Sequence, residues 1–241
     1  MIDKLYLEKH GFVISDKVFN QNELHSLNNV ASNILPFVGM CKKRGWLDHE
    51  DDKTKDVDWA YYWSVTPENN PFINETILPL LAHMCDDLLG RDNWGWQLTN
   101  RYIISNYQHD YPVYPHLDAP YLWPQMPNVQ MAKYLAKGLL SVTFMIPLIE
   151  FTVENGATGF IPGSHNYVHD TTYWDQVASH RQTFFNDNYV QPAVPLGSFS
   201  CFYGNCMHSV MSNKTNTVRR AIIFRGIRND ALDEMSRLGL G

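Results

Sequence analysis

An H-x-D motif, made by His116 and Asp118, follows directly after a predicted strand. Positions i and i+2 of an extended chain face the same side, so these two side chains can offer neighbouring ligands to one metal ion. A histidine from a distant strand would complete the 2-His-1-carboxylate set that non-heme Fe(II) oxygenases use. His208, at the end of a β-like run, is the candidate. Alone, the H-x-D pair is a weak signal, because such pairs also form hydrogen bonds in turns.

An arginine pair opens the next predicted strand, and Arg219 stands eleven residues after His208. A guanidinium can hold the far carboxylate of a bidentate co-substrate through a forked pair of hydrogen bonds. Strand alternation places Arg219 and Arg225 on one face and Arg220 on the other. Periodicity alone leaves open which of Arg219 and Arg220 points toward the metal.

The elements that must position these residues are mostly strands in the last two thirds of the chain. We expect β-type runs at residues 96–107, 139–148, 198–203 and 218–227, separated by turns with proline and glycine. A short strand at 11–14 precedes two helices, one from about Asn20 to before Pro36 and one over 74–89. This pattern indicates an α+β barrel or sandwich, mostly β with flanking helices, and we expect a single domain over residues 1–241.

Composition narrows the class of protein. The 241 residues are 44% hydrophobic and 13% aromatic, enough for a full core, and the net charge of −6 argues against a nucleic-acid partner. No apolar run approaches the 18 or so residues of a membrane span, so no membrane partner is expected. Charged residues interrupt every apolar run near the N-terminus, which predicts no signal peptide and a cytoplasmic location.

A second motif lies between the H-x-D pair and the distal histidine. Residues 155–165 read N-G-x-x-x-x-x-P-G-S-H, and residues 9–14 read K-H-G-F-V-I. Together with the H-x-D pair, His208 and Arg219, these segments resemble the phytanoyl-CoA dioxygenase (PhyH) family over residues 5–228. The resemblance implies a double-stranded β-helix, the cupin-like jelly-roll core of Fe(II)/2-oxoglutarate oxygenases, with N-terminal helices packed on its larger sheet.

The resemblance also implies an activity and its residues. The enzyme is expected to hydroxylate a small-molecule metabolite at a C–H bond, using Fe(II), 2-oxoglutarate and O₂ and releasing succinate and CO₂. His116, Asp118 and His208 would be the iron ligands and catalytic residues. Family spacing selects Arg219 for the distal carboxylate of 2-oxoglutarate, with Arg220 as the alternative.

The resemblance also bears on the other residues that contact 2-oxoglutarate. The family often carries a small hydroxyl residue two positions beyond the distal histidine, whereas this chain has Val210. Asn106 and Tyr107, before the H-x-D turn, are therefore expected to contact 2-oxoglutarate instead. Related halogenases have Gly or Ala in place of the metal carboxylate, so the presence of Asp118 favours hydroxylation.

The substrate region and a cover are also predicted. Tyr121, Trp123 and Met126 follow the metal turn and are expected to border the substrate, with core packing as the alternative. The polar run 48–58 is either a solvated loop or a lid over the pocket. No basic patch suggests the phosphates of a CoA thioester, which favours a small free metabolite.

Two other functions remain open. A zinc or other metal hydrolase would need a general base beside its bound water, and no such base accompanies His165, for which we expect a structural role. A catalytically inactive jelly-roll module that binds a small molecule is the main alternative, and such a module would be expected to lack one of the metal ligands or the arginine.

Overall fold

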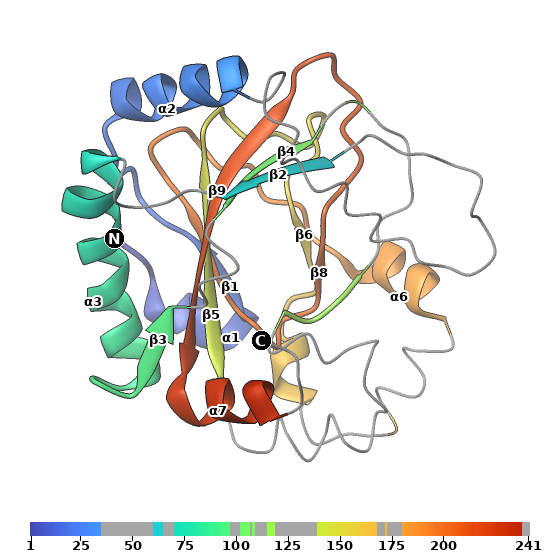
Figure 1. Cartoon of the computed structure of the whole chain (residues 1–241). Coiled ribbons are helices and arrows are strands. Elements are labelled where there is room, and N and C mark those ends of the chain that lie inside the picture. Colours follow the sequence, from blue (N-terminus) through green and yellow to red (C-terminus); the bar gives the residue numbers. More distant parts are fainter. Residues whose placement is uncertain are drawn as a thin grey trace.

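The structure is a computed structural model that describes residues 1–34, 60–64, 70–96, 102–106, 108, 115–118, 139–167, 172 and 180–237. Within these residues seven strands form one antiparallel sheet in the order β1-β7-β5-β9-β4-β2, and β3 also pairs with β9 (Figure 1). The strands of this sheet are β1 (Phe12–Ile14), β2 (Ala60–Ser64), β3 (Trp94–Trp96), β4 (Tyr102–Asn106), β5 (Ser141–Pro147), β7 (Ser200–Tyr203) and β9 (Arg219–Arg228).

Two short strands, β6 (Gly159–Phe160) and β8 (His208–Ser209), form a second sheet. Aromatic side chains join it to the large sheet: Phe160 stacks on Phe12 at 4.6 Å and meets Phe202 edge-on at 5.2 Å between ring centroids. The two β layers make the jelly-roll core that the sequence resemblance implies.

Strand β9 is the centre of the large sheet. It pairs with β5 along one side and with β3 and β4 along the other. The run expected over 96–107 contains the end of β3 and all of β4, with β3 against the end of β9 and β4 against its beginning. Residues 97–101 and 107 lie outside the described part of the chain.

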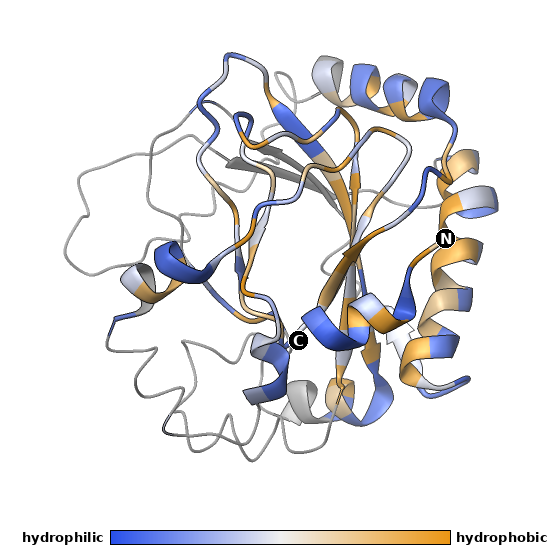
Figure 2. Ribbon diagram, turned by 180° about the vertical axis from the view of Figure 1, so that it is seen from behind, coloured by the Kyte–Doolittle hydropathy of each residue, from blue (hydrophilic) through white to orange (hydrophobic). Residues whose placement is uncertain are grey.

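Helices cover one face of this sheet, as Figure 1 shows for α2 (Gln21–Ile34) and α3 (Leu78–Leu89). Hydrophobic residues of both helices, coloured orange in Figure 2, belong to the same buried core as the strand residues Phe144 and Phe224. The predicted second helix is present, although it starts with a π-helical turn, η2 (Ile73–Ile77), and Gly90 follows its last residue with a φ of 93°. Against α3, the β9 residue Gly226 leaves room for the buried thiol of Cys85.

Further helices are not predicted from the sequence pattern: α1 (Lys4–His10), α6 (Arg181–Asn188), α7 (Asn229–Arg237) and the 3-10 turn η4 (Ser164–Tyr167). The side chain of Asp3 caps α1 by accepting a hydrogen bond from the Tyr6 amide, and Gly11 ends it with a φ of 82°. With a single fully buried residue, Leu7, α1 has too few apolar positions to show a helical period.

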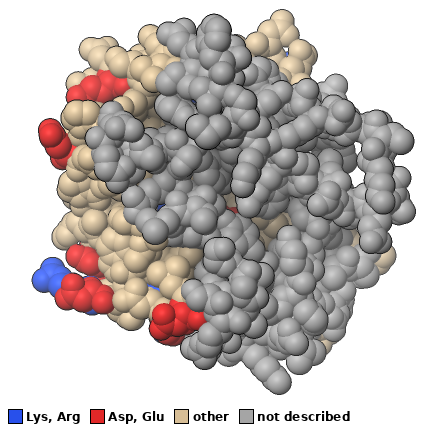
Figure 3. All heavy atoms as spheres, in the orientation of Figure 1, with Lys and Arg blue, Asp and Glu red and all other residues tan. Residues whose placement is uncertain are grey.

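The sequence predicts no basic patch, no membrane span and either a solvated loop or a lid over 48–58. Charged side chains of the described residues are scattered at one margin of the molecule in Figure 3 and form no broad basic surface there. None of the described helices is both long and apolar enough to cross a membrane. The predicted lid over 48–58 lies outside the described residues.

Candidate metal centre

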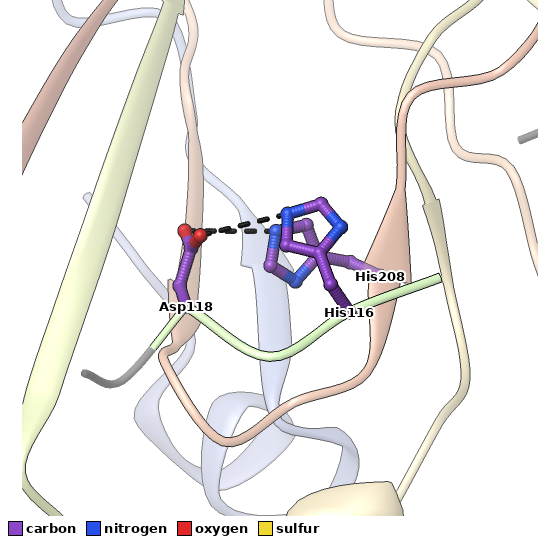
Figure 4. A group of neighbouring side chains, drawn as sticks. All are labelled: His116, Asp118 and His208. Carbon is purple, nitrogen blue, oxygen red and sulfur yellow. Dashed lines mark ion pairs between the residues drawn. The ribbon is translucent and has the colours of Figure 1, made fainter. Parts of the chain in front are cut away.

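Three side chains from two distant segments of the chain converge between the two β layers (Figure 4). Nε2 of His116 lies 3.6 Å from Oδ1 of Asp118, and Nε2 of His208 lies 3.6 Å from Oδ2. One ligand atom from each residue falls within 4.8 Å of the others. This is the group that the H-x-D motif and His208 predict as neighbours.

The backbone explains why the two histidines meet. His116 and His208 form an isolated antiparallel bridge in which each amide donates to the other's carbonyl, at 3.0 and 3.1 Å. Residues directly opposite in such a pair project their side chains to the same face. The Asp118 amide donates to the Gly204 carbonyl at 2.8 Å, so the segment that carries the motif is held at both of its functional positions.

The orientation of the His208 ring is also set by the backbone. Its Nδ1 lies 2.9 Å from the Cys206 carbonyl, which can only accept, so Nδ1 carries the proton. Nε2 is then left with a lone pair directed toward Asp118. A ring nitrogen that donates to a carbonyl while the other faces the site is the usual arrangement of a metal-ligating histidine.

The protonation states suit metal binding. Burial lowers the pKa of His208 to about 4, so the imidazole is neutral near pH 7. Burial by itself would raise the pKa of Asp118, but the positive charge of Arg225, together with His208 and His116, more than offsets this and holds that pKa well below its usual range. A neutral imidazole and an ionised carboxylate are the forms that bind a metal ion.

The donor set fits a divalent transition metal. Donors that lie about 2.0–2.2 Å from one ion are at most roughly 4.4 Å apart. The two histidine–carboxylate separations, both 3.6 Å, meet this limit. Two imidazoles and one carboxylate on one face are typical of non-heme iron sites with open positions. The arrangement can hold an ion and leave one side of it to other ligands.

The two candidate arginines lie on opposite faces of β9. Arg219 is 1% exposed, and its guanidinium carbon sits 4.6 Å from the centre of the Phe151 ring. Arg220 is turned toward the helical layer, where its Nη1 donates to Oδ1 of Asn28 on α2 at 3.1 Å. A guanidinium on the buried face, opposite the helices, can bind a carboxylate through a forked pair of hydrogen bonds.

The other predicted site residues are placed only in part. The backbone of Asn106 lies opposite Arg219 in the β4–β9 register. Tyr107, Tyr121, Trp123 and Met126 lie outside the described residues.

Neither the N-G nor the P-G-S-H motif supplies a ligand to the three-residue group, and the P-G-S-H segment holds the chain before His208 in place. Ser164 Oγ accepts a hydrogen bond from the Met207 amide at 2.8 Å, one residue before His208. The Ile161 amide donates to the Met207 carbonyl at 2.9 Å, and the Asn205 side chain donates to the His165 carbonyl at 3.2 Å. His165 itself bonds through Nε2 to the Glu8 carbonyl at 2.9 Å, away from the metal group.

Two functional contacts are not predicted from the sequence. Arg225 forms an ion pair with Oδ2 of Asp118, and Thr143 Oγ1 donates to the same oxygen at 3.2 Å. The position of Arg225 could have been inferred from the sequence, because strand alternation places it on the same face as Arg219. Thr143 carries no comparable signal, since its position depends on the register between β5 and β9.

Comparison with known proteins identifies a matching family and two curated relatives. A family model described as Phytanoyl-CoA dioxygenase (PhyH) matches residues 7–221. Dioxygenase cdmD of Talaromyces verruculosus is 34% identical over 83 residues, which are 34% of this chain and 24% of that protein. Dioxygenase trt7 of Aspergillus terreus is 36% identical over 83 residues, or 34% and 26% of the two chains. The match thus spans about a quarter of the length of these relatives.

Solved structures show the same fold. The non-heme alpha ketoglutarate dependent epimerase SnoN from nogalamycin biosynthesis superposes with a TM-score of 0.61 at 15% identity, covering 93% of this chain and 80% of SnoN. The carbocyclase SnoK from the same biosynthesis gives a TM-score of 0.62 at 15% identity, covering 93% and 82%. SnoN has also been crystallised with Fe3+, alpha ketoglutarate and nogalamycin RO.

Proposed function

Because the chain belongs to the phytanoyl-CoA dioxygenase (PhyH) family, we propose that it is a non-heme Fe(II)/2-oxoglutarate-dependent oxygenase that hydroxylates a small-molecule metabolite at a C–H bond. The observation that carries this proposal is the convergence of His116, Asp118 and His208. An inactive binding module has no need to bring two imidazoles and a carboxylate together at metal-binding distances, so this convergence supports the enzyme over the module.

In this proposal four side chains bind the metal and the co-substrate. His116, Asp118 and His208 hold the iron, and Arg219 binds the distal carboxylate of 2-oxoglutarate through its buried guanidinium. Iron and 2-oxoglutarate supply the activation of O₂, with release of succinate and CO₂. The protein binds and orients these groups and, through the buried surroundings of Asp118 and His208, keeps bulk water from them.

The same proposal assigns roles to the remaining predicted site residues. Asn106 is on the strand beside Arg219, which supports a contact with 2-oxoglutarate, and Tyr107 is proposed to share it. Tyr121, Trp123 and Met126 are proposed to border the substrate, because they follow the metal turn in the sequence.

The substrate is proposed to be a free metabolite rather than a CoA thioester. The structural neighbours SnoN and SnoK are an epimerase and a carbocyclase of natural-product biosynthesis, which supports a small organic substrate. Their reactions also show that this fold serves oxidative outcomes other than hydroxylation, so ring closure or epimerisation is the second candidate outcome.

The test is release of succinate from 2-oxoglutarate with a panel of free metabolites and acyl-CoA thioesters. We expect turnover that requires Fe(II), is stimulated by a free metabolite and is abolished in His116→Ala. His180→Ala is the matched control, because His180 is an exposed histidine ahead of α6. Turnover that persists in His116→Ala, or a wild-type protein that binds neither Fe(II) nor 2-oxoglutarate, would contradict the proposal.

A further inference from the structure

One oxygen of Asp118 is held by two side chains that are not metal ligands. Arg225 pairs with Oδ2 through its Nη2, and Thr143 Oγ1 donates to Oδ2 at 3.2 Å. Nε of Arg225 in turn donates to Thr143 Oγ1 at 3.0 Å. The three side chains therefore form a closed triangle of hydrogen bonds, and each of the three residues is less than 5% exposed.

The sheet makes this triangle rigid. Thr143 on β5 and Arg225 on β9 are directly opposite each other in the antiparallel register. Directly opposite side chains lie on the same face of the sheet at neighbouring positions. Both strands are internal to the large sheet, with pairing partners on each side, so neither residue can shift without disturbing the ladder.

The triangle fixes the carboxylate of Asp118 where it faces the two histidines. Its Oδ2 is held by Arg225 and Thr143 and lies 3.6 Å from Nε2 of His208. Its Oδ1 lies 3.6 Å from Nε2 of His116. The direction of the carboxylate is therefore set by two side chains that are not themselves metal ligands.

Building on the proposed oxygenase function, we propose that Arg225 and Thr143 are positioning residues that hold Oδ2 of Asp118 and so keep its carboxylate directed toward the two histidines for metal binding. Because 2-oxoglutarate would bind to the metal, the pair supports its binding through Asp118. Partners of this kind around a metal ligand typically change metal affinity by roughly 10- to 100-fold.

The experiment compares Thr143→Val, which keeps the shape and removes the hydroxyl, with Thr143→Ser, which restores the hydroxyl. Thr158→Val is the matched control, because Thr158 is also a buried threonine but its hydroxyl faces the sulfur of Met145. Each protein is titrated anaerobically with Fe(II), and then with 2-oxoglutarate. Co(II) substitution reports the coordination of the metal through its visible absorption.

We expect Thr143→Val to bind Fe(II) roughly 10- to 100-fold more weakly, to lose 2-oxoglutarate affinity and to change the Co(II) spectrum. Thr143→Ser and Thr158→Val should stay within about threefold of wild type. Arg225→Lys, which keeps the charge and loses the Nε donor, should resemble Thr143→Val, and the double variant should be little worse than either, because both act on one oxygen. If Thr143→Val does not fold, Arg225→Lys decides the question.

The binding measurements distinguish failure of the positioning role from failure of the oxygenase proposal. If wild type binds Fe(II) and 2-oxoglutarate while Thr143→Val and Arg225→Lys match Thr158→Val in affinity and spectrum, the positioning role is wrong and the oxygenase proposal stands. If wild type binds neither Fe(II) nor 2-oxoglutarate, both proposals are wrong.

Discussion

His116 and His208 exchange both of their main-chain hydrogen bonds, so the spacing of two metal-ligand side chains is set by backbone pairing between segments far apart in the chain. The side chains are therefore presented together before any ion binds. A substitution that preserves the backbone bridge should remove a ligand without removing the fold.

His208→Asn tests this directly. An asparagine amide can occupy the place of Nδ1 and keep the bond to the Cys206 carbonyl, but it offers nothing at the place of Nε2. We expect at least a 100-fold loss of Fe(II) affinity, measured anaerobically by titration, with thermal unfolding of the metal-free protein close to wild type. The control is His180→Asn on the surface, which should change neither measurement. Wild-type Fe(II) affinity in His208→Asn would show that this histidine is not a ligand.

Arg219→Met and Arg220→Met separate the two arginines. A charge-assisted bond to a carboxylate contributes about 1.5–3 kcal/mol, which corresponds to roughly a 10- to 150-fold change in affinity. We expect that loss for 2-oxoglutarate in Arg219→Met, with Fe(II) binding unchanged. Arg220→Met should lose the contact with Asn28 and keep 2-oxoglutarate affinity. The reverse pattern would assign the co-substrate to Arg220.

The local part of the site was predictable from the sequence, and the long-range part was not. Positions i and i+2 bring His116 and Asp118 to one side, and alternation puts Arg219 and Arg225 on one face. The contact of Thr143 with Asp118 depends instead on which residue of β5 lies opposite Arg225. Register between distant strands is set by tertiary packing, which no single segment encodes.

Ser164 tests the claim that the P-G-S-H motif supports the metal segment. Its hydroxyl accepts from the Met207 amide and donates to the Ile161 carbonyl, both at 2.8 Å. Ser164→Ala would leave a buried amide without a partner, which costs about 1–3 kcal/mol. We expect that loss in denaturant unfolding, together with weaker Fe(II) binding because the segment before His208 loosens.

Ser141→Ala is the control for this prediction. Among the described residues, the buried hydroxyl of Ser141 has no hydrogen-bond partner. Its removal should therefore change stability by less than about 0.5 kcal/mol. Equal losses in the two variants would mean that the hydrogen bonds of Ser164 have no special part in holding the segment.

His165 makes stability depend on pH. Burial lowers its pKa below 6.5, partly opposed by the bond to the Glu8 carbonyl and assisted by the nearby His10. The unfolded chain then takes up this proton at a higher pH than the folded chain does, so the contribution is full above pH 6.5 and is lost as pH falls below it. His165→Gln, which can keep the bond to Glu8, should show a smaller loss of unfolding free energy between pH 7 and pH 5. A pH dependence identical to wild type would contradict this.

The packing of α3 on the large sheet should be coupled to a single position on β9. A Cβ atom at Gly226 would lie 2.5 Å from Sγ of Cys85 and 3.4 Å from Cδ1 of Leu89. Cys85 is fully buried, so Gly226→Ala should destabilise the protein by about 1–3 kcal/mol.

The double variant with Cys85→Ala tests this contact. Cys85→Ala removes the sulfur and leaves a small cavity. Because the alanine methyl then occupies that space, the double variant should be more stable than the sum of the two single losses predicts, by about 1 kcal/mol or more in denaturant unfolding. Additive losses would show that the helix moves away from the strand instead, and that this contact does not set the distance between the two layers.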